Sequence, residues 1–91
     1  MKVTIESIFP SHESPRYLFG KKGTDEYVVF SPMDMGADFC FELNDIVKFG
    51  KVSQGPVEAI NQTKNKTAWV GIHDICVSKD VIRVRYDPQF P

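Results

Sequence analysis

The sequence predicts an all-β domain, folded as a small antiparallel barrel of five to seven strands. Three observations lead to this fold class. Apolar residues recur at every second position in several short runs, as they do in strands that bury one face. Turn-forming Gly, Pro and Asp residues separate these runs at intervals of about 8–12 residues, which is typical of a barrel or sandwich. The length of 91 residues suits a single domain spanning 1–91.

Three strands are expected in the first third of the chain. Residues 3–9 alternate and stop at Pro10, because proline cannot donate to a strand ladder. Residues 17–19 and 27–30 are rich in aromatic and β-branched side chains. The Gly- and Lys-rich stretch 20–26 forms the turn between them.

The stretch 38–49 allows two interpretations. As a strand, residues 38–43 place three apolar side chains on one face, namely Phe39, Phe41 and Leu43. A helix over 38–49 is the alternative, because several of its apolar residues also recur at helical spacing. Flanking glycines and the high aromatic content favour the strand.

The second half of the chain adds further short strands and one helix. Residues 47–52, 68–72 and 75–77 are strand-like. Pro56 is tolerated at the first position of a helix, so we expect one short helix near 56–62.

The clearest alternation lies at 81–86 and predicts a C-terminal strand. On such a strand Arg83 and Arg85 share the outer side and form a candidate basic face. A solvated surface is the favoured interpretation of these two arginines. The residues after them, 87–91, are expected to form a loose tail.

Composition bears on function and location. The formal net charge of −1 gives no global basic footprint of the kind that nucleic-acid-binding proteins show. No apolar run approaches a membrane span and no signal-peptide core follows Met1, which predicts a cytoplasmic protein with no membrane association. In that reducing compartment Cys40 and Cys76 are expected to be buried free thiols rather than a disulfide.

Catalytic and metal-binding patterns are sparse. His73, Asp74 and Cys76 suggest a thiol nucleophile with a base, but adjacent positions on a strand face opposite ways. An edge-strand histidine beside a buried cysteine is therefore the favoured interpretation. The chain has no CxxC spacing for zinc and no glycine-rich phosphate loop. We expect a non-enzymatic binding module with no catalytic residue, no cofactor and no metal.

The first candidate partner is single-stranded RNA or DNA. Aromatic side chains on adjacent strands, rimmed by lysines, provide a platform on which bases stack, each contributing about 1–3 kcal/mol. The residues that would form it are Phe19, Lys21, Lys22, Tyr27, Phe30, Phe39 and Phe41. The alternative is that these aromatics fill the core of a small barrel.

The run from Leu18 to Ile46 resembles the central part of a cold-shock domain. Leu18-Phe19 stands where that family carries a Trp-Phe pair. Lys22-Gly23, followed by residues 27–30, resembles its first ribonucleoprotein motif, and residues 38–43 resemble its second. The resemblance implies an OB-like barrel that binds single-stranded nucleic acid.

Two departures from the family pattern add negative charge. Residues 24–27 replace the aromatic-Gly-aromatic part of the first motif and bring Asp25 and Glu26 to the phosphate-facing turn. Glu42 stands where the second motif has a histidine. Each of these carboxylates disfavours a polyanion.

The second candidate partner is a protein. A small domain with near-neutral charge and no catalytic set suits an inhibitor, immunity or adaptor protein of bacterial or phage origin. Aromatic residues available to such a surface are Trp69, Tyr86 and Phe90. For Trp69, inside an Ala-Trp-Val run, a core position is favoured over an interface hot spot.

Overall fold

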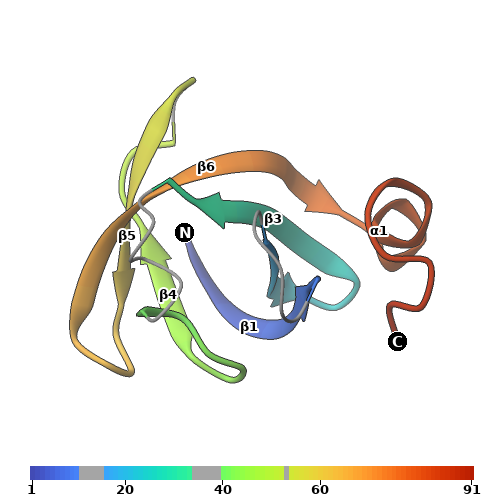
Figure 1. The fold of residues 1–91 in the computed structure, drawn as a ribbon, viewed down its shortest axis with the longest axis horizontal. Helices are drawn as coiled ribbons and strands as arrows, with labels where there is room; N and C mark the ends of the chain where they lie inside the picture. Colours follow the sequence, from blue (N-terminus) through green and yellow to red (C-terminus); the bar gives the residue numbers. More distant parts are fainter. Residues whose placement is uncertain (11–15, 34–39, 53) are drawn as a thin grey trace.

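The computed structural model describes residues 1–10, 16–33, 40–52 and 54–91. Within these ranges it has six strands and one helix, namely β1 (Lys2–Phe9), β2 (Tyr17–Gly23), β3 (Glu26–Pro32), β4 (Ile46–Phe49), β5 (Pro56–Asn61), β6 (Lys66–Val77) and α1 (Lys79–Arg85). The strands form one closed barrel in the order β1-β2-β3-β6-β5-β4 (Figure 1), and every neighbouring pair is antiparallel. The predicted all-β barrel is confirmed.

Two three-stranded meanders make the barrel, and two strand pairs join them. β1 pairs with β4, where Lys2 lies opposite Lys48, and β3 pairs with β6, where Ser31 lies opposite Gly71. Each strand that the structure describes therefore has a neighbour on both sides. Closure removes most of the free edges on which another strand could add, although residues 72–77 of β6 pair with β3 alone.

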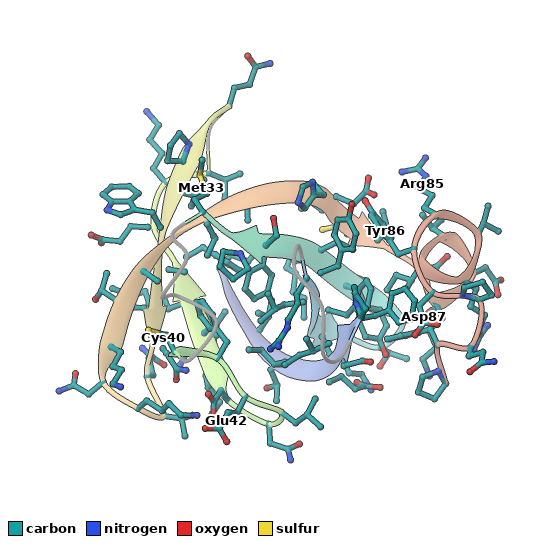
Figure 2. All side chains as sticks on the ribbon, viewed as in Figure 1. Met33, Cys40, Glu42, Arg85, Tyr86 and Asp87 are labelled. Atoms are coloured by element: carbon teal, nitrogen blue, oxygen red, sulfur yellow. The ribbon has the colours of Figure 1, made fainter. Side chains whose placement is uncertain are left out.

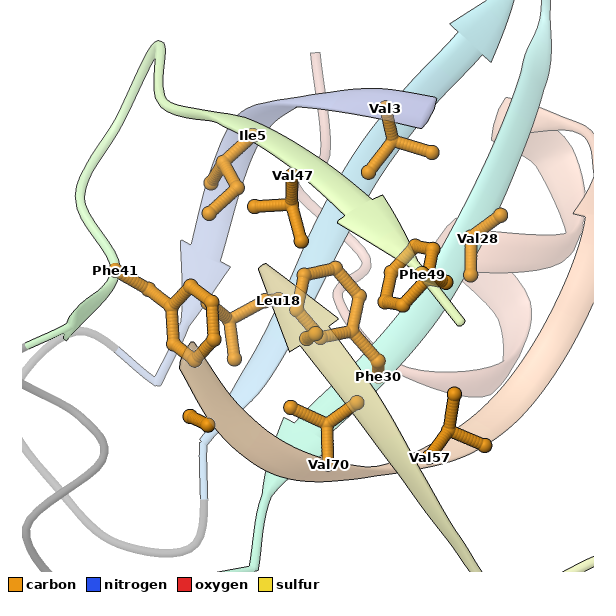
Figure 3. Close-up of a cluster of buried hydrophobic side chains, with 12 residues drawn as sticks. Val3, Ile5, Leu18, Val28, Phe30, Phe41, Val47, Phe49, Val57 and Val70 are labelled. Atoms are coloured by element: carbon orange, nitrogen blue, oxygen red, sulfur yellow. The ribbon is translucent and has the colours of Figure 1, made fainter. Parts of the chain in front are cut away.

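The barrel interior is filled by alternate residues of each strand. The buried side chains that make this core are Val3, Ile5, Leu18, Val28, Phe30, Phe41, Val47, Phe49, Val57, Ala59, Ala68 and Val70 (Figure 3). Gly20 faces the same interior, and a Cβ there would collide with the side chain of Val3. The close approach of β2 to β1 thus depends on a residue without a side chain.

A second core lies outside the barrel, on the outer side of β2 and β3. Phe19, Tyr27 and Val29 pack there with Ile82 of α1 and with Phe90, and each is at most 2% exposed. The rings of Phe19 and Tyr27 meet the ring of Phe90 edge to face, at centroid distances of 5.3 and 5.2 Å. Helix α1 and the residues after it therefore cover this side of the barrel, at the right of Figure 1.

The strand predicted at 81–86 is wrong, because these residues belong to α1 and its C-cap. The hydroxyl of Ser78 caps the helix by accepting a hydrogen bond from the backbone N–H of Val81 at 3.4 Å. Asp25, in the β2–β3 turn, accepts a hydrogen bond from the backbone N–H of Lys79 at 2.8 Å. These two acceptors satisfy N–H groups that a helix start leaves unpaired.

The side chains of α1 divide between the second core and solvent. Ile82 and Tyr86 lie one helical turn apart and both pack on the second core, whereas Val84 is 86% exposed. A period of three to four residues therefore describes which side chains of this segment are buried better than a period of two residues does. Among the described residues, no helix is long and apolar enough to cross a membrane.

The short helix expected near 56–62 is also wrong, since Pro56–Asn61 form β5. Alternate residues of this strand are buried, namely Val57, Ala59 and Asn61. Of the stretch 38–49, only Ile46–Phe49 form a strand. Residues 41–45 precede it without regular structure, and residues 38 and 39 lie outside the described part of the chain.

The expected loose tail at 87–91 is packed against the fold. Phe90 is 2% exposed within the second core, and its carbonyl accepts a hydrogen bond from Nε of Arg83 at 2.8 Å. Asp87 is buried and accepts a hydrogen bond from the backbone N–H of Gln89 at 3.0 Å. This segment is held against the fold because Phe90 buries a large apolar surface there.

Candidate interaction surface

Four aromatics of the predicted nucleic-acid site are buried, which corrects their expected exposure. Phe30 and Phe41 lie inside the barrel, whereas Phe19 and Tyr27 lie beneath α1, and none is more than 3% exposed. The Tyr27 hydroxyl donates to a carboxylate oxygen of Glu6 at 3.2 Å. Burial, together with that carboxylate, raises the pKa of Tyr27 to about 12. The core interpretation of these four side chains is therefore confirmed.

The lysines of the predicted nucleic-acid site are exposed but have different surroundings. Lys21 lies on the outer side of β2, opposite Thr4 of β1. Nζ of Lys22 lies 3.5 Å from Sγ of Cys76 on β6. Phe39, the remaining aromatic of the predicted site, lies outside the described residues.

Lysines gather instead on the outer side of β1, β2 and β4. Lys2 lies directly opposite Lys48, and Lys21 lies opposite Thr4, two residues along β1 from Lys2. Directly opposed residues have Cβ atoms about 5 Å apart, and diagonal neighbours about 7–8 Å. Like charges at these spacings repel one another, so this basic cluster of Lys2, Lys21 and Lys48 favours an anion.

The arginines predicted to share a strand face lie on α1 and are engaged in ion pairs. Arg83 is 3.0 Å from Asp80 and also donates to the carbonyl of Phe90. Arg85 is 2.8 Å from Asp74 of β6. The candidate basic face formed by Arg83 and Arg85 is therefore wrong in geometry, because the strand that would align them is a helix.

Trp69 is exposed rather than part of the core. The inward positions of this part of β6 are taken by Ala68 and Val70, so the indole points outward and is 49% exposed. Met33, which is 54% exposed, donates its backbone N–H to the carbonyl of Trp69 at 3.0 Å. Glu58 of β5 lies directly opposite Trp69 on the other side and is exposed.

A gap in side chains follows Trp69 along β6. Gly71 pairs with Ser31 of β3 and with Pro56 of β5, and His73 follows two residues later. A Cβ built on Gly71 would meet no atom of the described residues within 4 Å. We call this feature the Gly71 notch, with Trp69 and His73 as its walls and Gly71, Ser31 and Pro56 as its floor.

The far wall of the notch is fixed by its neighbours. Nε2 of His73 lies 2.7 Å from Oγ of Ser31, within hydrogen-bond distance. The ring of Tyr17 meets the imidazole edge to face at a centroid distance of 5.1 Å. Two contacts from different strands therefore hold the His73 ring, which itself is exposed.

Beyond His73, a polar contact ties α1 to β6. The Tyr86 hydroxyl donates to the Asp74 carboxylate, which also pairs with Arg85. Burial, then that carboxylate, raise the pKa of Tyr86. Arg85 at the end of α1 and Tyr86 at its C-cap lie at the right of Figure 2, whereas Met33 lies toward its upper left. β6 therefore links the covered end of the barrel to the exposed end.

A buried polar network joins the segment before β4 to the β5–β6 turn. The Asp45 carboxylate accepts hydrogen bonds from Nδ2 of Asn61 and Nζ of Lys64, both at 2.7 Å, and from the N–H of Glu42 at 2.9 Å. Asn61 also donates to the carbonyl of Cys40. Burial alone raises the pKa of Asp45, but these hydrogen bonds outweigh it and hold the pKa below its ordinary value.

The histidine–cysteine pair considered from the sequence does not form. Nε2 of His73 is next to Ser31, whereas Sγ of Cys76 is next to Lys22. Cys40 and Cys76 are both free, Cys40 being half-buried and Cys76 exposed. The expected burial of Cys76 is therefore wrong.

Comparison with known proteins identifies no relative. No protein-family model, no curated protein and no solved structure matches this chain. A site on this chain is therefore identified from the chemistry of its own residues, and the Gly71 notch has the exposed rings of Trp69 and His73 on either side of it.

Proposed function

We propose that this chain is a non-enzymatic binding module whose partner is another protein. The observation that carries the proposal is the half-exposed indole of Trp69, flanked by exposed Met33. Tryptophan is among the residues that contribute most to protein interfaces, since it offers a large apolar area with few rotatable bonds. A single surface tryptophan beside an empty notch supplies both an anchor and a place for a partner side chain.

Electrostatics favour a protein over a nucleic acid at this surface. The residue directly opposite Trp69 is the exposed carboxylate of Glu58, which repels phosphate. The basic cluster lies on β1, β2 and β4, and β5 separates β4 from the strand that carries Trp69. An oligonucleotide that stacked on Trp69 would therefore have its backbone next to a carboxylate rather than next to the lysines.

Single-stranded nucleic acid is the second candidate partner, and one observation favours it. The direct pairing of Lys2 with Lys48, beside Lys21, is unfavourable in the free protein and would be relieved by phosphates. Such binding would depend on charge alone, without the stacking that the buried aromatics were expected to provide.

The test of a protein partner compares three forms of the full chain. Immobilised wild type, Trp69→Ala and Val84→Ala are used to capture proteins from an extract, with quantification by mass spectrometry. Val84 is the matched control, because it is a more exposed apolar side chain on a different element. We expect at least one protein that Trp69→Ala loses and Val84→Ala keeps, and that rebinds when purified. Equal capture by all three forms would count against the proposal.

A cytoplasmic location is part of the same proposal. The two free thiols of Cys40 and Cys76 support a reducing compartment. We expect a fluorescent fusion of this chain to be recovered in the cytoplasmic fraction after cell fractionation. Recovery in an oxidising compartment would contradict the proposal.

A further inference from the structure

Gly71 has no structural reason to be a glycine in the described part of the fold. Glycine inside a strand costs about 0.5–1 kcal/mol relative to alanine, because it gives up more backbone freedom on folding. At Gly20 that cost is required, since a Cβ would collide with Val3. At Gly71 a Cβ meets no described atom within 4 Å. A glycine inside a strand marks a bulge, a bend or a place where another molecule approaches the backbone, and the bulge of β6 against β3 lies beyond Gly71, between Ile72 and Asp74.

The occupant of the Gly71 notch cannot bind by adding a strand. Gly71 is already paired on both sides, with Ser31 of β3 and Pro56 of β5. β-strand addition requires a free edge, which this strand does not have there. At Gly71 the occupant must therefore bind through side chains and ring faces, whereas from Ile72 to Val77 β6 is paired with β3 alone.

The dimensions and walls of the notch fit an extended chain. Trp69 and His73 are four residues apart along β6, which corresponds to at most about 13 Å at a rise of about 3.3 Å per residue, because the register with β3 shifts by one residue at His73. A polyproline II helix rises about 3.1 Å per residue and leaves its own backbone without internal hydrogen bonds. About four residues of such a chain span the distance between the two rings. Aromatic-lined surfaces are the usual docking sites for this conformation.

Charge specifies one more property of the occupant. Glu58 is exposed and lies directly opposite Trp69, with no ion-pair partner among the described residues. A lysine or arginine of the partner, placed at the Trp69 end, gains both this carboxylate and the face of the indole.

From these observations we propose that the Gly71 notch binds an extended, proline-containing segment of a partner protein, with a basic residue of that segment beside Trp69 and Glu58. The proposal rests on the function proposed above and names the chemistry of the partner. Trp69 and His73 form the two ring contacts, and Gly71 provides the room between them.

The experiment titrates the full chain with three defined probes while the emission of Trp69, the only tryptophan, is recorded. The first probe is a ten-residue peptide of alternating proline and alanine with one arginine. The second has alanine in place of every proline, and the third is a ten-nucleotide single strand of thymidylate. We expect the first probe to shift the emission and to bind at least about tenfold more tightly than the second.

Two variants separate a filled notch from a damaged fold. Gly71→Val places a β-branched side chain in the notch and should weaken binding of the proline peptide by at least about tenfold, with an unfolding temperature equal to or above that of the wild type. Thr67→Val adds the same side chain two residues before Trp69 on the same side of β6, and should change binding by less than about twofold. Glu58→Gln should weaken binding of the arginine-containing proline peptide, because it removes the carboxylate beside Trp69.

Three results would overturn the proposal. They are an unchanged Trp69 emission up to millimolar proline peptide, equal binding by wild type and Gly71→Val, and a response to the thymidylate strand but not to the peptides. A partner captured through Trp69 but indifferent to Gly71→Val would leave the protein-binding function standing and would falsify the notch alone.

Discussion

The outer sides of β3 and β6 each carry a large aromatic side chain, but only the one on β3 is covered by another part of the chain. Outward-facing Tyr27 on β3 is completely buried, because α1 and Phe90 lie on it. Outward-facing Trp69 on β6 is half exposed, and the next outward position is Gly71. The difference teaches that a large outward aromatic is a binding candidate only where no other element of the chain covers it.

The largest effect is expected from opening the covered side. Phe90→Ala removes a ring that contacts both Phe19 and Tyr27, and should lower the free energy of unfolding by about 3–5 kcal/mol. Urea unfolding measures the loss. Val84→Ala, on the exposed side of α1, is the control and should stay within about 0.5 kcal/mol. A loss of less than about 1 kcal/mol in Phe90→Ala would contradict the assignment of Phe90, Phe19 and Tyr27 to a second hydrophobic core.

The buried network around Asp45 tests how much a polar contact away from both surfaces contributes to the stability of the barrel. Asp45→Asn weakens the hydrogen bonds to Asn61 and Lys64 and should cost about 1–3 kcal/mol at neutral pH. Because the folded pKa of Asp45 is lowered, its contribution is complete above the unfolded pKa of about 3.9 and is lost as the pH falls through the folded pKa.

The stabilities of wild type and Asp45→Asn should therefore converge in acid. Unfolding free energies measured from about pH 7 down to about pH 2 give this profile. A difference between the two proteins that stays constant over the whole range would contradict a role for the ionised carboxylate.

The two glycines sharpen the comparison between a filled and an open surface. Gly20→Ala should destabilise by about 1–3 kcal/mol, because its Cβ meets Val3. Gly71→Ala should stabilise by up to about 1 kcal/mol, because its Cβ meets open space. Thermal unfolding of both variants is sufficient, and changes of the same sign would contradict the different roles assigned to them.

The smallest effect concerns the basic cluster. Lys48→Glu converts its repulsion with Lys2 into attraction and should stabilise by about 0.2–1 kcal/mol at low salt, with the gain fading as salt screens the pair. If a nucleic acid binds this cluster, the same change should lower the slope of log affinity against log salt by about 0.7. Lys79→Gln, on α1, is the control for both measurements.

The strand at residues 3–9 was predictable because its alternation agrees with a single buried side, whereas the strand at 27–30, which is buried on both sides, was predictable from its aromatic and β-branched residues. The sequence of α1 misled because Val, Ile and Arg alternate there as in a strand. What decides for a helix is the Ser78 cap and the docking of Ile82 on a surface from β2 and β3. That surface is formed by residues more than 50 positions earlier, which a local pattern does not contain.

The exposure of Trp69 could have been predicted from the alternation of side chains along a strand. If Ala68 and Val70 face the interior, Trp69 between them must face outward. The size of the indole suggested the core and outweighed that pattern. The Gly71 notch was not predicted, because it depends on which residues of β3 and β5 lie opposite the glycine. Register between distant strands is a property of the closed barrel rather than of any one segment.

β6 also carries a natural pair of spectroscopic positions. Trp69, the single tryptophan, and the exposed thiol of Cys76 are seven residues apart, at most about 23 Å along an extended strand. With Cys40→Ser removing the other thiol, an acceptor dye on Cys76 would receive energy from the indole of Trp69 on the same strand. Gly71 and His73 lie between the two positions. The efficiency of energy transfer therefore reports on the distance across the segment of β6 where a partner is expected to bind.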